Sequence, residues 1–138
     1  MQNVLIIGAS SGIGKELTRK LIFSGIRVYG TYNNRTISSE DGNGSFYPLQ
    51  VMDENTTFDF LPDTLDGLVY CPGSVVLMPF SRIKPEEFVN DYKLQVVGAV
   101  KVIQACLPRL KNSEQGSVVL FSTVAVTLGF NFHSLVSS

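Results

Sequence analysis

The first half of the chain alternates short apolar runs with apolar residues at helical spacing. Residues 4–7 form an unbroken run of β-branched residues and leucine, which is typical of a central strand buried on both faces. The helical spacing follows at Ile13, Leu17 and Leu21. Gly25 is placed to end this helix after Ser24, and residues 26–32 form the next extended run. The alternation predicts a parallel sheet whose strands are connected by helices.

The middle of the chain has a weaker helical pattern. Residues 33–45 are polar and rich in Asn, Ser and Gly, so we expect a loop there instead of a full crossover helix. Residues 46–51 predict a short third strand, and residues 67–71 predict a fourth. Between these strands, residues 53–65 have room for one short helix, which Pro62 would interrupt.

A long helix is predicted to begin at Pro85, because proline is tolerated in the first helical turn and two glutamates follow it near the positive end of the helix dipole. Its apolar face is formed by Phe88, Tyr92, Val96, Val97, Val100, Ile103, Leu107 and Leu110. Pro108 and Gly116 indicate that the helix frays near there. Residues 117–121 predict a fifth strand.

These elements predict one α/β domain over residues 1–138, with a doubly wound parallel sheet in the strand order 3-2-1-4-5, which right-handed crossovers produce. No repeat, low-complexity tract or linker divides the chain. Its 44% hydrophobic and 17% charged residues are typical of a globular protein.

Charge and hydropathy narrow the classes of partner. A net charge of −1 gives no electrostatic reason to expect nucleic acid or an anionic membrane. No apolar run approaches the ~20 residues needed to cross a bilayer. Residues 1–3 lead directly into the first strand, so we expect no secretory leader. Cys71 and Cys106 are far apart and outside a CxxC spacing, so we expect reduced, buried thiols in a cytoplasmic protein without a metal site.

The sequence Gly8-Ala9-Ser10-Ser11-Gly12-Ile13-Gly14 lies between the first strand and the first helix. Glycine lets a backbone approach a pyrophosphate closely, and the start of a helix offers free N–H groups and a positive dipole. This context predicts dinucleotide binding. The alternative is a tight turn that binds no ligand.

The GxxxGxG spacing of this turn, in the form GASSGIG, resembles the short-chain dehydrogenase/reductase family. The resemblance extends over nearly the whole chain, through residues 70–73, 95–98 and 122–123 in order. It implies a Rossmann-type fold that binds NAD(P) and a small alcohol or carbonyl substrate. The residues it implies for cofactor binding are Gly8, Ser10, Ser11, Gly12, Ile13, Gly14, Asn33, Arg35, Cys71, Pro72 and Gly73.

The end of the second strand predicts the choice of nicotinamide cofactor. Enzymes that use NAD place an acid ~20 residues after the glycines, but here no acid occurs between the end of the second strand and Glu40. Arg35 could hold the 2′-phosphate of NADP with its planar donors, and Lys15 could add positive charge. We therefore expect a preference for NADP(H), with a solvated loop arginine as the alternative.

The family resemblance implies a Tyr-x-x-x-Lys pair for proton transfer, a Ser beside the substrate oxygen and an Asn that holds a water molecule. Alignment on the fifth strand places Thr123, or less well Ser122, at the serine. Gln95 replaces the asparagine. No Tyr follows Tyr92 and no Lys follows Lys111, so the Tyr-x-x-x-Lys pair is absent under any alignment.

The family tyrosine would fall near Val136, and His133, the only histidine, lies in the same segment. Its ordinary pKa suits proton transfer near neutral pH. It is a candidate acid or base, although Ser137 stands where the accompanying lysine would be needed. The alternative is a loop histidine at the rim of the site.

The resemblance also implies further strands and an active-site helix after the fifth strand. We therefore expect the working protein to be longer, because residues 117–121 would otherwise form an apolar sheet edge. The family implies a homo-oligomer. Three readings of function remain open at this point: a catalytic oxidoreductase, a non-catalytic member that binds dinucleotide as a sensor or partner subunit, or a Rossmann-like domain that binds no ligand.

Overall fold

The computed structural model describes residues 2–37, 40–73 and 77–137. Its strands form one sheet in the order β3-β4-β2-β1-β5-β6. The strands are β1 (Asn3–Ile7), β2 (Arg27–Tyr32), β3 (Glu40–Asp41), β4 (Gly44–Pro48), β5 (Gly67–Tyr70) and β6 (Ser117–Leu120). The helices are α1 (Gly12–Phe23), the 3-10 turn η1 (Phe80–Arg82), α2 (Pro85–Tyr92), the π-helical segment η2 (Lys93–Val97), α3 (Gly98–Lys111) and α4 (Ala125–Leu128).

The five longer strands are parallel, and the predicted order 3-2-1-4-5 is confirmed. The short strand β3 was not predicted, because it lies inside the polar stretch 33–45. It pairs antiparallel with the start of β4, where Gly42 takes a φ of +55°. Glycine adopts such a φ readily, which allows the tight turn between β3 and β4. The predicted third strand, 46–51, is β4 and ends at Pro48.

The short helix predicted within residues 53–65 is wrong. This segment forms turns up to the start of β5. The Asp53 carboxylate accepts a hydrogen bond from the Asn55 N–H at 2.9 Å, and the Thr56 hydroxyl donates to the Gln50 carbonyl at 2.7 Å. Such local side-chain bonds compete with helical hydrogen bonds. The segment is instead anchored by burial of Phe58, Leu61 and Leu65.

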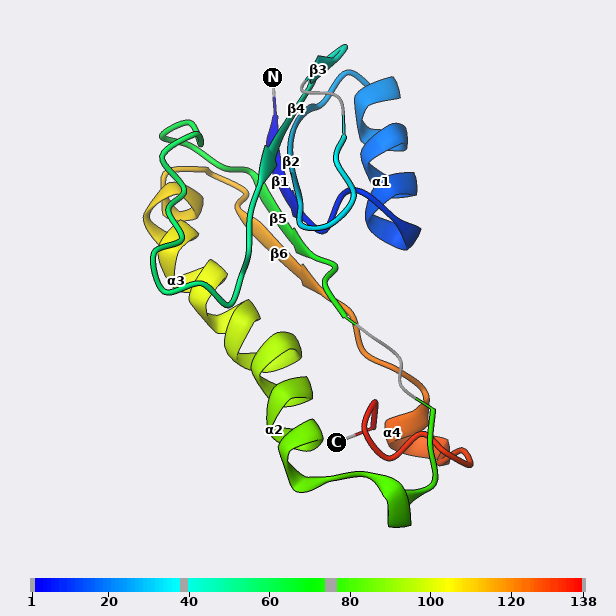
Figure 1. The fold of residues 1–138 in the computed structure, drawn as a ribbon. Helices are drawn as coiled ribbons and strands as arrows, with labels where there is room; N and C mark the ends of the chain where they lie inside the picture. Colours follow the sequence, from blue (N-terminus) through cyan, green and yellow to red (C-terminus); the bar gives the residue numbers. More distant parts are fainter. Residues whose placement is uncertain (1, 38–39, 74–76, 138) are drawn as a thin grey trace.

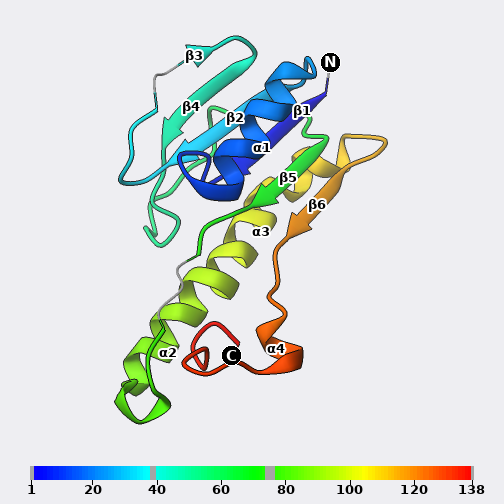
Figure 2. The same cartoon turned by 90° about the vertical axis from the view of Figure 1, so that its right-hand side faces the viewer.

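Two apolar cores lie on opposite faces of the sheet. Figure 1 shows α1 on one side of the strands and α3 on the other, and Figure 2 shows the same layers after rotation. Along β1, Ile6 faces the α1 core, whereas Leu5 and Ile7 face the α3 core. The first run of the sequence is thus a strand buried on both faces, as predicted.

The helix that begins at Pro85 runs through η2 to Lys111, so Pro108 lies inside it and does not end it. Its buried side chains are Ala99, Val102, Cys106 and Leu110. The predicted apolar face is therefore only partly the buried one. Tyr92, Val96, Val100 and Leu107 are exposed, as are the residues of β6 and most of α4. Periodicity alone does not distinguish an apolar stripe that is packed from one that is not.

Both views place α4 beyond the ends of β5 and β6, at the same end of the molecule as α2 (Figures 1 and 2). The backbone of the last segment returns toward the chain before η1, where the Met78 N–H donates to the Phe132 carbonyl at 3.2 Å. Within the described ranges, no helix combines the length and apolar composition needed to cross a membrane.

The Asp66 carboxylate joins the starts of β1 and β5 to the end of α3. It accepts hydrogen bonds from the Asn3 N–H at 2.7 Å and from the Ser113 hydroxyl at 2.7 Å. The Asn3 amide, followed by the Ser113 hydroxyl, lowers the pKa of Asp66 below its ordinary value. The charged form of Asp66 is therefore stabilised by folding.

Acid is expected to remove this stabilisation. Because the pKa of Asp66 is lowered in the folded state, its contribution is present above the unfolded-state pKa and is lost as the pH falls through the folded-state pKa. We expect Asp66→Asn to lower the free energy of unfolding by about 1 kcal/mol near neutral pH, since hydrogen bonds to a partly exposed charge are worth little more. Urea unfolding of both proteins at neutral and at acidic pH measures this. A difference that does not shrink in acid would contradict it.

Candidate functional site

A glycine turn connects the end of β1 to α1. Gly8 and Gly12 have φ values of +84° and +54°, in the region that glycine adopts without strain. The turn is fastened to β2, because the Gly8 N–H donates to the Thr31 hydroxyl at 3.2 Å and the Ala9 N–H donates to the Thr31 carbonyl at 2.8 Å. A Cβ on Gly14 would overlap the Gly8 carbonyl oxygen. The glycines therefore set both the shape of the turn and its packing against α1.

The start of α1 is suited to an anion. Ser11 is the N-cap residue, its side chain makes no capping hydrogen bond, and the first turn contains no acidic residue. The unpaired N–H groups and the positive end of the helix dipole are therefore not neutralised by a neighbouring side chain of that turn. Beside them, a Cβ on Gly12 would meet nothing within 4 Å. This open space lets a phosphate group approach the backbone.

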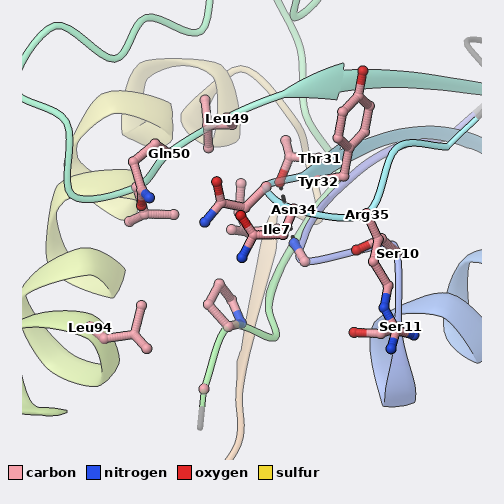
Figure 3. A pocket seen from close by; sticks show the side chains of 15 residues that line it. Ile7, Ser10, Ser11, Thr31, Tyr32, Asn34, Arg35, Leu49, Gln50 and Leu94 are labelled. Carbon is pink, nitrogen blue, oxygen red and sulfur yellow. Dashed lines mark hydrogen bonds between the residues drawn. The ribbon is translucent and has the colours of Figure 1, made fainter.

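A first cavity of about 370 Å³ opens at the ends of β1, β2 and β4. It brings together seven of the residues expected to bind cofactor, namely Gly8, Ser10, Ser11, Asn33, Arg35, Pro72 and Gly73. In the view of Figure 3, the Arg35 side chain lies on the same side of the cavity as Ser10 and Ser11, with Gln50 and Leu94 opposite. The position at the carboxyl ends of parallel strands is the usual ligand site of such sheets.

Sequence reasoning missed the far wall of this cavity. Leu49, Gln50 and Val51 follow β4, and Leu94 comes from η2. The rule that ligands bind beyond the carboxyl ends of strands would have indicated the three residues after β4. No local signal marks Leu94, because its side chain reaches the cavity only through the packing of the long helix.

A second cavity of about 490 Å³ lies between the end of β5, the long helix and the residues after β6. It shares Pro72 and Gly73 with the first cavity. The other expected site residues that line it are Ile13, Cys71, Gln95, Ser122 and Thr123. The structure thus separates the expected residues into two groups that meet at the end of β5.

Two polar side chains of the second cavity, those of Gln95 and Thr123, have hydrogen-bond partners. Gln95 donates an amide hydrogen bond to the Asp91 carboxylate at 2.8 Å. The Thr123 hydroxyl oxygen accepts from the Ala125 N–H at 3.2 Å, which stabilises the turn into α4. Ser122 is exposed. Thr123 keeps its own hydroxyl proton available to donate toward the cavity.

Three expected residues lie outside both cavities. Gly14 is buried beneath Gly8, and Gly12 lines a third cavity, of about 540 Å³, together with Lys15. His133 lies in the segment after α4, with its Nδ1 2.6 Å from the Asn131 carbonyl oxygen and its ring 5.3 Å from that of Phe130. The structure therefore does not bring His133 to the other expected site residues.

Burial determines the protonation of the two titratable groups at the end of β5. It raises the pKa of Tyr70 to about 12 and the pKa of Cys71 to about 11. Both groups are therefore neutral at neutral pH, so Cys71 presents a thiol and not a reactive thiolate. In this arrangement the two cavities offer hydrogen-bond donors, apolar walls and an anion site at the start of α1.

Comparisons with known proteins agree with this geometry. The model of the short chain dehydrogenase family matches residues 2–137. Human 17-beta-hydroxysteroid dehydrogenase type 1 is 26% identical over 150 residues, covering 96% of this chain and 46% of the relative. Human retinol dehydrogenase 8 is 25% identical over 152 residues, covering 99% of this chain and 49% of the relative.

Solved structures show the same fold. A short chain dehydrogenase/reductase family protein matches with a TM-score of 0.87 at 22% identity, over 99% of this chain and 61% of that one. The structure of ElxO with NADP bound matches with a TM-score of 0.86 at 24% identity, over 99% of this chain and 61% of that one.

The chain spans about half the length of the curated relatives it matches. Within that span the resemblance carried by the glycine turn is confirmed, because the family model extends from β1 to the residues after α4. The chain belongs to the short-chain dehydrogenase/reductase family of oxidoreductases.

Proposed function

We propose that this chain is the NADP(H)-binding part of a longer short-chain dehydrogenase/reductase that interconverts a small alcohol and the corresponding carbonyl compound. The observation that carries the proposal is the uncapped, acid-free start of α1, which follows directly on the glycine turn at the edge of the first cavity. When bound, the nicotinamide cofactor supplies or accepts the hydride. The residues of this chain bind and orient it.

The two cavities match the two halves of a dinucleotide. The pyrophosphate fits at Ser11 and Gly12, where helix N–H groups are open. The adenosine half fits the first cavity, between Arg35 and the wall at Leu49 and Gln50. The nicotinamide half fits the second cavity, which Thr123 lines. Pro72 and Gly73 border both, and the absence of a side chain at Gly73 leaves space for the cofactor to pass.

The loop after β2 supports a preference for NADP(H). Arg35 is exposed and lines the first cavity, together with Asn33 and Asn34. A guanidinium group binds phosphate through parallel N–H donors, and no carboxylate in residues 33–37 repels the 2′-phosphate. Lys15 lines a neighbouring cavity that shares Ser10 with the first, so it adds positive charge from a greater distance.

Within the described chain, Thr123 is the residue we assign to orient the substrate oxygen, through the hydroxyl proton that its bond to Ala125 leaves free. We assign Gln95 to hold a water molecule, although its amide is paired with Asp91. The chain contains no Tyr-x-x-x-Lys, so a second candidate function is a non-catalytic member that binds dinucleotide as a sensor or partner subunit, which the comparisons do not favour. Turnover of an alcohol by the full-length protein would separate the two.

The same proposal includes a cytoplasmic location and a homo-oligomer. The two free cysteines, Cys71 and Cys106, accord with a reducing compartment. The exposed apolar residues of α2, α3 and β6 offer surface that a further part of the protein or a second copy would cover.

Titration with NADPH, and separately with NADH, tests the proposal. We expect NADPH to bind at least tenfold more tightly than NADH, a difference of about 1.4 kcal/mol that one charge-assisted contact to the 2′-phosphate can supply. Cofactor fluorescence measures both dissociation constants. Equal affinities would refute the NADP preference, and no binding of either would refute the proposed function of this chain.

A further inference from the structure

The long helix changes its hydrogen-bond pattern beside the two cavities. In an α-helix the Leu94 carbonyl would accept a hydrogen bond from the Gly98 N–H. In η2 the Gly98 N–H donates to the Lys93 carbonyl instead, one residue further back. A π turn of this kind deprives one carbonyl of its α-helical donor and is often found at functional sites.

Tyr70 supplies a donor for that carbonyl. Its hydroxyl donates to the Leu94 carbonyl oxygen at 2.5 Å, across 24 positions of sequence. The Tyr70 side chain is 5% exposed, and burial raises the pKa of Tyr70 to about 12. The hydroxyl therefore stays protonated and able to donate throughout the neutral pH range.

Gly98 leaves the space that this contact needs. A Cβ at Gly98 would overlap the Tyr70 hydroxyl and would lie 2.9 Å from Cγ1 of Val51. Any larger residue at position 98 would thus displace the hydroxyl from the Leu94 carbonyl. The tyrosine, the glycine and the π turn form one connected arrangement.

This arrangement connects the walls of both cavities. The Leu94 side chain lines the first cavity, where Figure 3 shows it across from Ser10 and Ser11. Gln95, the next residue, lines the second cavity. On the other side of the hydrogen bond, Tyr70 directly precedes residues 71–73, which border the cavities at the end of β5.

We propose that Tyr70 is a positioning residue, whose hydroxyl holds the π turn so that Leu94 and Gln95 keep their places in the walls of the cofactor site. This rests on the proposed binding of NADP(H). The role differs from that of a catalytic tyrosine, because the hydroxyl is directed at a backbone carbonyl and not at a reacting atom. Without it, part of the binding energy of the cofactor would be used to order the π turn.

Tyr70→Phe tests the proposal, since it removes only the hydroxyl. We expect the dissociation constant for NADPH to rise about fivefold, the size typical for loss of one hydrogen bond. In the protein without cofactor, we expect amide hydrogen exchange within residues 93–98 to become faster. Tyr47→Phe is the matched control, because β4 is separated from β5 by β2 and β1. It should change neither quantity.

Gly98→Ala provides an independent test of the same contact. It should weaken NADPH binding in the protein with Tyr70, and should have a smaller effect in the background of Tyr70→Phe, where the overlap with the hydroxyl is gone. Equal effects in the two backgrounds would show that Gly98 does not act through Tyr70.

The measurements separate failure of this inference from failure of the proposed function. If the unmutated protein binds NADPH and Tyr70→Phe binds it equally well, the positioning role is refuted, whether or not exchange changes. If the unmutated protein binds neither cofactor, the proposed function is refuted. In that case, amide hydrogen exchange within residues 93–98 still tests whether the Tyr70 hydroxyl holds the π turn. Equal exchange rates in the unmutated protein and in Tyr70→Phe would refute that role as well.

Discussion

Replacing Gly14 with alanine is expected to lower the free energy of unfolding by about 3 kcal/mol, at the upper end of the usual range for overpacking. The added Cβ would overlap the Gly8 carbonyl oxygen and would lie 2.9 Å from the Gly8 carbonyl carbon. Both atoms belong to the backbone of the turn, which Thr31 holds through two hydrogen bonds. The loss exceeds the ~1 kcal/mol that alanine gains over glycine inside a helix.

The same substitution should weaken NADPH binding at least tenfold in the protein that remains folded. Relief of the overlap must move either α1 or Gly8, and both form the proposed pyrophosphate site. Urea unfolding and cofactor titration measure the two effects. Gly25→Ala is the control, because Gly25 follows the C-terminal end of α1, with a φ of +81° and open space around an added Cβ. It should cost about 1 kcal/mol through backbone strain alone, with unchanged affinity. An equally stable Gly14→Ala protein would contradict the packing argument.

Arg35→Asp is expected to weaken NADPH binding about a hundredfold, or about 2.7 kcal/mol, while NADH binding changes less than threefold. The substitution removes the guanidinium donors from the first cavity and places a carboxylate near the proposed 2′-phosphate position. NADH has no phosphate there, so neither the lost contact nor the new repulsion applies to it. Fluorescence titration of both cofactors gives the ratio of affinities, in which differences in folding cancel.

Two further variants make the result specific. Arg82→Asp reverses an exposed charge in η1 that lines neither the first nor the second cavity, and should leave the ratio unchanged apart from weak, salt-screened effects. Arg35→Gln should produce an intermediate loss, because its amide keeps donors but not the charge. If Arg35→Asp weakens both cofactors equally, Arg35 acts on the shared part of the dinucleotide or on folding, and the proposed phosphate contact is refuted.

The shape of the glycine turn was more predictable than the hydrogen-bond partners of Gln95 and Thr123. A tight strand-to-helix turn requires a positive φ at Gly8 and Gly12. The glycines themselves indicate this requirement in the sequence. The partners of Gln95 and Thr123 are also near in sequence, at Asp91 and Ala125. Their bonds nevertheless depend on rotamers and turns that no pattern of residue types specifies.

Some predictions were wrong or incomplete because the pattern of residue types does not show how the elements pack against one another. Residues 53–65 carry no strong periodicity, so local side-chain bonds and the burial of Phe58 decided their conformation against the expected helix. Along α3, the apolar stripe was visible in the sequence. Which part of it is buried depends on where the sheet lies, because only Val102, Cys106 and their buried neighbours face the core.

The sequence by itself determined the parallel α/β sheet, its strand order and the glycine turn at the start of α1. Each depends on periodicity, β-branched runs or glycine, whose effects act between residues near in the chain. Only the tertiary structure decided the cavity wall at Leu94, the contact between Tyr70 and the π turn, and the position of His133 outside both cavities. These features bring together residues from separate strands and helices, so they depend on distances that no local pattern encodes.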